Sequence, residues 1–498
     1  MKNKILFPLI ILLFSGIFSP ISAQLRWNVT EEGMNDSQVR AYLGESDQGY
    51  GFVFSFPTRK WFSELRHGIA IRYFDEDMNL LTQEGLSENT PPYLNIRDFN
   101  EYIAVFGKGE TDHEEKGDAV ILFLDEQGQE VERKTWSLSG SRHIWIGSRA
   151  YISSDSAHFI VCFREQCIPD QPSLEPDPIV NHVAVFDRDL KVVWERSYDN
   201  KICYSRKQSL AIDGLNFTRN NQLLIYGTEY YDNHLHIFAF TVKDAKSEAV
   251  NVLDETLPSL VGETLALQLN FRQFISPSND LIVFAYITEE LMTRSMFFVR
   301  QNLTTKSGRR AAYYLIDDSF EETYPFFGKG LRQFPLIRDV SLWNDGLIVS
   351  GERIIGGTSC TVRNISLLKF SSDGVIEWVK SINKNIYFPE YKSDYLLKVF
   401  PSGEELVLFY YDTPENVNSD VLVSGNKSIQ VTKLFNGTCL TVARINSEGL
   451  IESTKIINRY IENQIIPDNS SIHQVDEKRF ILYGTKNGNN AFSTYTLD

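Results

Sequence analysis

Cysteine is scarce in this chain of 498 residues, which contains five. No two of them follow the Cys-x-x-Cys spacing, which excludes zinc ribbons and thioredoxin-type redox sites. A chain of this length can bury a large apolar core, so it does not need disulfides to fold. Because the count is odd, at least one thiol stays outside any intramolecular disulfide. The five are Cys162, Cys167, Cys203, Cys360 and Cys439.

The common catalytic motifs are missing as well. The sequence has no Gly-x-Ser-x-Gly nucleophile elbow, no Walker loop, no His-Glu-x-x-His pair and no glycine fingerprint for dinucleotides. These absences exclude the usual α/β-hydrolases, P-loop NTPases, zincin metalloproteases and Rossmann dehydrogenases. No motif therefore names a reaction, and we expect no cofactor.

Long apolar runs are missing after the first 23 residues. Lys2 and Lys4 precede an apolar run, Ile5 to Phe18, which is followed by the small residues that end at Ala23. This order is typical of a secretory signal, with cleavage after Ala23 and a mature domain of residues 24–498. An uncleaved anchor is the alternative, but the run is shorter than the roughly 20 residues that span a bilayer. We expect export to the periplasm, cell surface or medium, with no membrane span.

Acidic residues outnumber basic ones, 65 to 49. Losing the signal would remove two lysines and leave 47 basic residues. A chain with this excess of negative charge repels phosphate backbones, so nucleic acid is excluded as a partner. The charge is spread through turns, as in a solvated and soluble surface, and we expect a monomer.

A pair of short apolar segments recurs eight times along the chain. Each segment is bounded by Gly, Asp, Asn or Ser, and helical periodicity is scarcely visible, so the segments are predicted strands. The first members of the pairs are GYGFVFSF, EYIAVFG, HFIVCF, QLLIYG, DLIVFAY, GLIVSG, ELVLFYY and RFILYG. The second members include HVAVFDRDL, ISLLKFSSDG and LTVARINSEG.

A tight turn follows the second strand of several pairs. In FSSDGVIEWVK it contains Asp373 and Gly374, and the same slot holds Asp189 and Leu190 in another repeat. Such a turn needs a positive φ, which glycine adopts freely. A tryptophan stands four residues after this slot in two repeats, where it can pack on the neighbouring repeat; the two are Trp194 and Trp378.

Small antiparallel units of this kind bury their apolar faces by stacking radially, which predicts an all-β fold with a single β-propeller. The apolar strand, Asp/Gly turn and following Trp resemble the blades of secreted PQQ-like and WD-like propellers of bacterial exported proteins. The resemblance implies no redox activity, because no quinone-binding pattern is present. We expect eight blades, with seven blades or two smaller β domains as alternatives. The N-terminal segment 24–30 and the C-terminal segment 491–498 would pair in one blade and close the ring.

If strands run outwards from the axis, the Asp/Gly turns lie on one face and variable loops on the other. Long predicted loops cover residues 164–181, 351–364 and 411–438. Function is expected on the variable face, since loops on a rigid scaffold can change without disturbing the core. Charged residues at the second-strand ends could ring the central opening and bind a polar ligand, or form salt bridges between blades: Lys108, Arg164, Glu165, Glu229, Glu352, Arg353 and Lys486.

Two further features point to ligands or crosslinks. His234 and His236 share one side of a strand, and Glu229 or Asp232 could join them in a metal site, with ordinary packing as the alternative. Disulfides are predicted between cysteines in loop segments of adjacent repeats, namely Cys167 with Cys203 and Cys360 with Cys439.

Two functions fit this sequence. The first is an exported, non-catalytic propeller that binds a glycan or a protein on its variable face. The second is a carbohydrate-active enzyme, hydrolase or lyase, which would need carboxylates at the central channel. The candidates for that role are Glu165, Glu229 and Glu352.

Overall fold

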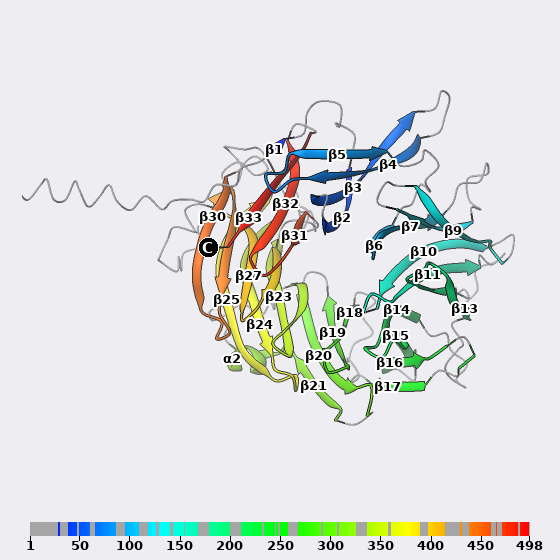
Figure 1. The fold of residues 1–498 in the computed structure, drawn as a ribbon. Helices are drawn as coiled ribbons and strands as arrows, with labels where there is room; N and C mark the ends of the chain where they lie inside the picture. Colours follow the sequence, from blue (N-terminus) through cyan, green and yellow to red (C-terminus); the bar gives the residue numbers. More distant parts are fainter. Residues whose placement is uncertain are drawn as a thin grey trace, which may run out of the picture.

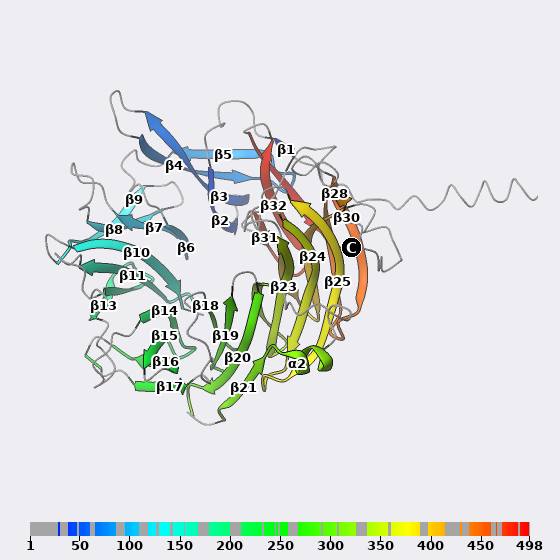
Figure 2. The same ribbon diagram turned by 180° about the vertical axis from the view of Figure 1, so that it is seen from behind.

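A computed structural model gives the arrangement of the chain as a ring of small sheets around a central opening (Figure 1). Figure 2 shows the same ring from behind. The structure describes residues 28–29, 38–46, 49–59, 65–85, 95–108, 118–125, 129–139, 143–153, 155–167, 179–199, 211–231, 234–244, 246–247, 250–256, 267–289, 292–305, 308–324, 336–356, 360–388, 397–413, 429–430, 438–459, 465, 471–486 and 489–497.

These residues form eight antiparallel sheets, which we number as blades 1 to 8 in chain order. Blade 1 contains β2 (Gln38–Ser46), β3 (Gly49–Arg59), β4 (Leu65–Phe74) and β5 (Leu80–Gly85). Blade 2 contains β6 (Asn95–Phe99), β7 (Tyr102–Lys108), β8 (Ala119–Leu124) and β9 (Glu130–Trp136). Blade 3 contains β10 (His143–Ile152), β11 (His158–Cys167), β12 (Ile179–Asp187) and β13 (Val192–Asp199), and blade 4 contains β14 (Ala211–Phe217), β15 (Leu223–Tyr231), β16 (His234–Val242) and β17 (Val250–Thr256).

Blades 5 to 8 continue the pattern. Blade 5 contains β18 (Leu267–Ile275), β19 (Asp280–Glu289), β20 (Met292–Asn302) and β21 (Arg310–Leu315). Blade 6 contains β22 (Leu336–Trp343), β23 (Gly346–Gly356), β24 (Cys360–Phe370) and β25 (Ile376–Phe388), and the short strand β28 (Ile429–Gln430) pairs in parallel with β25. Blade 7 contains β26 (Leu397–Ser402), β27 (Glu405–Asp412), β29 (Cys439–Ile445) and β30 (Ile451–Arg459), and blade 8 contains β31 (Ile472–Gln474), β32 (Arg479–Lys486), β33 (Asn489–Thr496) and β1 (Asn28–Val29). Helix α2 (Asp318–Thr323) follows blade 5.

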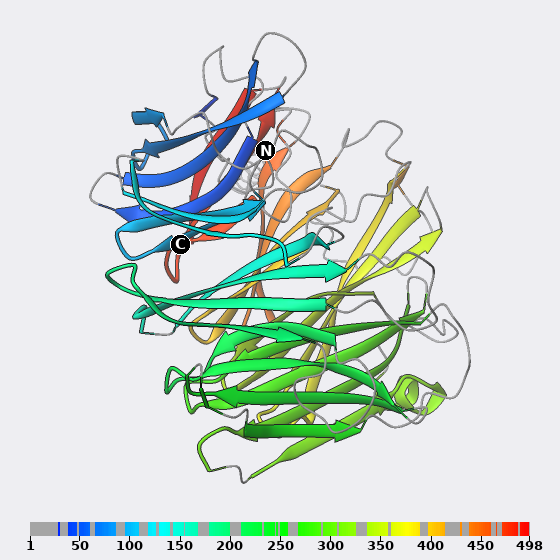
Figure 3. The same cartoon turned by 90° about the vertical axis from the view of Figure 1, so that its right-hand side faces the viewer.

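The arrangement is an eight-bladed β-propeller, as the repeats predict. The first strand of each blade lies next to the central opening and the last lies outside (Figure 1). From the side, the strands run between the two faces of the ring (Figure 3). The seven-bladed and two-domain alternatives are therefore wrong.

The two ends of the chain close the ring. β1 pairs antiparallel with β33, with Asn28 opposite Phe492 and Val29 opposite Ala491. Blade 8 thus takes its outermost strand from the N-terminal segment and its other three from the C-terminal one. The predicted closure by terminal strands is confirmed.

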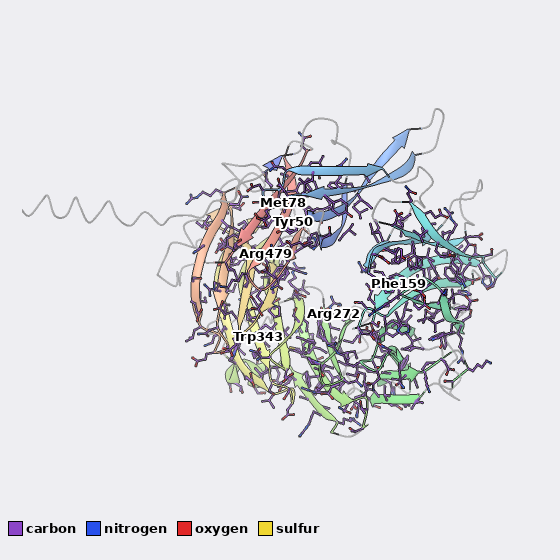
Figure 4. All side chains as sticks on the ribbon, viewed as in Figure 1. Tyr50, Met78, Phe159, Arg272, Trp343 and Arg479 are labelled. Atoms are coloured by element: carbon purple, nitrogen blue, oxygen red, sulfur yellow. The ribbon has the colours of Figure 1, made fainter. Side chains whose placement is uncertain are left out.

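The apolar core lies between the blades. The described residues form eight buried clusters, and each combines side chains from neighbouring blades. Phe159, labelled in Figure 4, belongs to the cluster between blades 2 and 3. A single blade cannot bury its apolar faces alone, so each face is covered by the neighbouring blade.

The tight turns join the third and fourth strands and contact the preceding blade. Gly374 has a φ of 80°, and Leu190 takes a φ of 62° in the same slot of blade 3. Trp378 Nε1 donates a hydrogen bond to Ser447 O in the corresponding turn of blade 7, at 2.9 Å. Trp194 packs on the core between blades 3 and 4. The predicted role of the two tryptophans is confirmed.

The loops between second and third strands lie on the opposite face, which we call the loop face. Large parts of the long predicted loops fall outside the described residues, and so does the predicted signal segment 1–23. Within the described part of the chain, no helix has the length and apolarity to cross a membrane.

One predicted disulfide is contradicted. The structure gives Cys439 as a thiol that is 1% exposed, with its sulfur 3.4 Å from Asp412 O and 3.6 Å from Thr441 Oγ1. The side chain points into blade 7, so a bond to Cys360 of blade 6 is wrong. Cys203 and the side chain of Cys167 lie outside the described residues, and their disulfide stays a prediction.

Cys162 is a free thiol in the core between blades 3 and 4, 3% exposed. Burial raises its pKa to about 12. Since the thiolate is the reactive form, we expect Cys162 to stay unmodified by iodoacetamide at pH 8 in the folded protein and to react fully in urea. Peptide mass mapping measures both. Labelling of Cys162 in the folded protein would contradict its placement.

Candidate functional site

A buried carboxylate lies near the loop face, at the boundary between blades 2 and 3. Glu165 of β11 is fully buried. It lies opposite Trp145 of β10 and Val180 of β12 in the strand register. Because side chains alternate along a strand, Phe163 and Glu165 share one face of blade 3. Phe163 packs in the cluster with blade 2, so Glu165 lies on the face that blade 2 covers.

Glu165 is bound by groups from three other segments. Ser139, in the connection between β9 and β10, donates its backbone N–H to Oε1 at 2.8 Å and its hydroxyl to Oε2 at 2.9 Å. His182 Nε2 of β12 lies 2.6 Å from Oε2. His143 Nδ1, at the start of β10, lies 2.5 Å from Oε1. We call Ser139, His143, Glu165 and His182 the Glu165 cluster.

The surroundings of Glu165 stabilise the ionised form of its carboxyl group. Burial alone would raise the pKa of its carboxyl, but the hydrogen bonds from Ser139 and His182 outweigh it and leave the pKa below the usual range. A buried carboxylate persists only with such partners. Glu165 is therefore ionised at neutral pH and accepts hydrogen bonds without donating any.

Aromatic side chains surround the cluster. Trp145 meets the His182 ring edge to face at 5.4 Å between centroids and the Phe163 ring at 5.9 Å. Trp136 lies 5.0 Å from Phe163, and the Lys134 ammonium sits over the Trp136 ring. Both tryptophans are partly exposed. The boundary thus combines polar groups with accessible apolar rings, as small-ligand sites do.

A second buried carboxylate lies in blade 6. Glu352 of β23 is 1% exposed, and its Oε1 lies 2.5 Å from Lys384 Nζ of β25. Arg338 Nε of β22 lies 3.6 Å from its Oε2. Lys384 is itself 2% exposed. Glu352 therefore joins the inner, second and outer strands of one blade instead of facing the opening.

The remaining predicted rim residues lie at corresponding ends of second strands. Arg353 is 5% exposed and Arg164 is partly buried. The backbones of Lys108, Glu229 and Lys486 lie in β7, β15 and β32, and their side chains are outside the described part. The contacts described for Glu165 and Glu352 link neither of them to another predicted rim residue.

The structure describes only part of the predicted metal site. His236 lies opposite Glu229 and His234 opposite Tyr231. His236 Nδ1 lies 3.0 Å from Thr256 Oγ1 of the neighbouring strand. Among the described residues, no group of three or more His, Cys, Asp or Glu side chains could hold a metal ion. The side chain of His234 is outside that part of the chain.

A cavity of about 290 Å³ lies between blades 8 and 1 on the face of the tight turns, opposite the loop face. Its lining includes Arg479 and Tyr50, both labelled in Figure 4. Arg479 binds Glu45 Oε2 at 2.9 Å, Asp476 Oδ2 at 2.5 Å and the Tyr50 hydroxyl at 3.0 Å. Arg479 therefore pairs with carboxylates of the first and last blades and joins the two blades. Since these charges are already paired, little free charge is left for a ligand.

The sequence pattern alone missed His143, His182, Ser139 and Lys384. Each comes from a different strand or connection, and their meeting depends on strand register. One signal in the sequence could have pointed to His182. Side chains alternate along β12, which places the polar His182 on the same face as the apolar Ala184 and Phe186.

No protein-family model matches the sequence. No curated protein matches it either. Similar solved structures include one of the prolyl endopeptidases studied for inter-domain dynamics, at 11% identity and a TM-score of 0.40, covering 93% of this chain and 55% of that one. Prolyl oligopeptidase B from Galerina marginata is 10% identical with a TM-score of 0.38, covering 92% of this chain and 56% of that one.

Polysaccharide lyase Uly1 is 7% identical with a TM-score of 0.42, covering 95% of this chain and 100% of that one. This chain spans about half the length of the two prolyl peptidases. Likenesses this distant assign no activity to it, and the site has to be judged by its own residues.

Proposed function

We propose that this chain is an exported β-propeller that binds a polar ligand, a glycan by preference over a protein, at the boundary between blades 2 and 3 on the loop face. One observation carries the proposal: a fully buried, ionised Glu165 contacts two partly exposed histidines beside the partly exposed Trp136 and Trp145. Ring faces that stack on sugars and polar groups that orient hydroxyls are what a glycan site needs.

The wider assignment follows the sequence. The N-terminal pattern supports export after cleavage near Ala23, and the turn-plus-tryptophan pattern supports kinship with PQQ-like propellers. We propose a monomer without a cofactor. N-terminal sequencing of protein recovered from the culture medium or periplasm tests the cleavage, and retention of residues 1–23 would contradict it.

Replacing Trp145 by alanine is expected to weaken ligand binding about tenfold or more, because it removes the ring beside His182. A glycan array on the full chain selects ligands, and titration calorimetry measures the affinity of each variant. Trp378→Ala in blade 6 is the matched control, expected to leave affinity unchanged. Equal loss in both variants, or no glycan bound at all, would contradict the site.

A second candidate function is a lyase at the same site. Glu165 orients His182 through a hydrogen bond and lies 2.5 Å from His143 Nδ1, and an imidazole supported by a carboxylate can abstract a proton. A glycoside hydrolase fits less well, because it needs a second carboxyl group nearby and the described partners of Glu165 are serine and histidine. Incubating the bound glycans with protein and analysing the products separates binding from cleavage.

A further inference from the structure

Ser197 lies next to the Glu165 cluster on the outermost strand of blade 3. It stands directly opposite His182 in the register of β12 and β13. Its Oγ lies 2.9 Å from His182 Nδ1, and its side chain is exposed to solvent. Ser197, His182 and Glu165 therefore form one hydrogen-bonded chain from the surface to a buried carboxylate.

The direction of the hydrogen bonds in this chain is determined by Glu165. Its carboxylate only accepts, so the His182 nitrogen 2.6 Å away, Nε2, carries the ring proton. In a neutral imidazole the other nitrogen is then an acceptor. Nδ1 thus presents its lone pair to the Ser197 hydroxyl, which donates to it. This is the protonation state of a general base placed beside a serine.

The order of groups is that of a serine, histidine and acid triad, with the roles of the two ring nitrogens exchanged. Triads are recognised by geometry and roles and not by sequence position, and both distances fall in the range expected for a serine nucleophile and its base. The Trp145 ring against His182 further fixes the imidazole. A surface serine without such a histidine beside it has no base to accept its proton.

We infer that Ser197 is an activated nucleophile and that this site hydrolyses small acyl esters. Ser197 Oγ attacks the ester carbonyl carbon while its proton passes to His182 Nδ1. The ester C–O bond breaks, and the alcohol leaves with that proton. Water then attacks the acyl-serine, giving its proton to His182, which returns it to Ser197 as the carboxylic acid leaves. This reaction is additional to the ligand binding proposed above and does not depend on it.

A fluorophosphonate probe tests the nucleophile directly on the full chain, with mass mapping of the modified peptide. We expect modification of Ser197 and none in Ser197→Ala. The rate should fall about 10²-fold in His182→Gln and in Glu165→Gln, since each removes the base or its orientation. Thr256→Ala, which removes the hydroxyl beside His236 in blade 4, is the matched control and should label at the normal rate.

Hydrolysis of 4-nitrophenyl acetate gives a second measurement. Its rate should exceed the uncatalysed rate in the parent chain and fall to the uncatalysed rate in Ser197→Ala. Circular dichroism confirms that each variant is folded. An unlabelled Ser197 in the folded protein, or equal labelling in His182→Gln, overturns the inference. Glycan affinity of the parent chain is measured separately, so that absence of labelling at Ser197 and absence of glycan binding are distinct results.

Discussion

Replacing Phe492 by alanine is expected to lower the free energy of unfolding by about 3–5 kcal/mol, the usual cost of removing a buried phenylalanine. Phe492 lies on β33 and is fully buried. Its ring centroid is 4.7 Å from that of Phe74 and 5.1 Å from that of Phe52, both in blade 1. The cavity would therefore open in the core that joins the last blade to the first.

Urea unfolding followed by fluorescence measures the change in midpoint and slope. Val131→Ala is the matched control, because Val131 is 48% exposed on β9 and should change stability by less than about 0.5 kcal/mol. A comparable small loss in Phe492→Ala would mean that the contact between blades 8 and 1 contributes little. The closure would then depend on β1 and the Arg479 contacts instead.

The ring itself could be predicted from local signals. Apolar strands and turn residues repeat in the sequence, and each carries its own evidence, such as the positive φ that Gly374 supplies. The predicted pairing of the terminal segments 24–30 and 491–498 is likewise found, as β1 with β33. The strand and turn signals depend on residues close together in the chain.

The candidate site was predicted only in part. Glu165 was selected as a rim charge, and it does lie near the loop face, but it is buried between blades. Its partners Ser139, His143 and His182 come from the inter-blade connection and two other strands. Which side chains meet there depends on strand register and on the facing blade, and neither is a property of one segment. Glu352 shows the same limit, since its partner Lys384 is 32 residues away.

Replacing Lys384 by methionine is expected to cost about 3–5 kcal/mol of stability, because it leaves the buried carboxylate of Glu352 without its nearest cation. The two charges lie 2.5 Å apart, and both side chains are 2% exposed. Arg338 remains, but its Nε is 3.6 Å from Glu352 and compensates only in part. Urea unfolding of the full chain measures the loss.

The double variant Lys384→Met with Glu352→Leu decides whether the loss comes from an isolated charge or from lost packing. Replacing both partners by apolar groups removes the unpaired charge, so stability should recover to near that of the parent chain, as other buried ion pairs do when replaced together. If the double variant is as unstable as Lys384→Met, the loss comes from packing or hydrogen bonds at the two positions and not from an isolated charge. Recovery would instead show that blade 6 needs charge balance at this position, so that Glu352 is occupied within the blade and unavailable to a ligand.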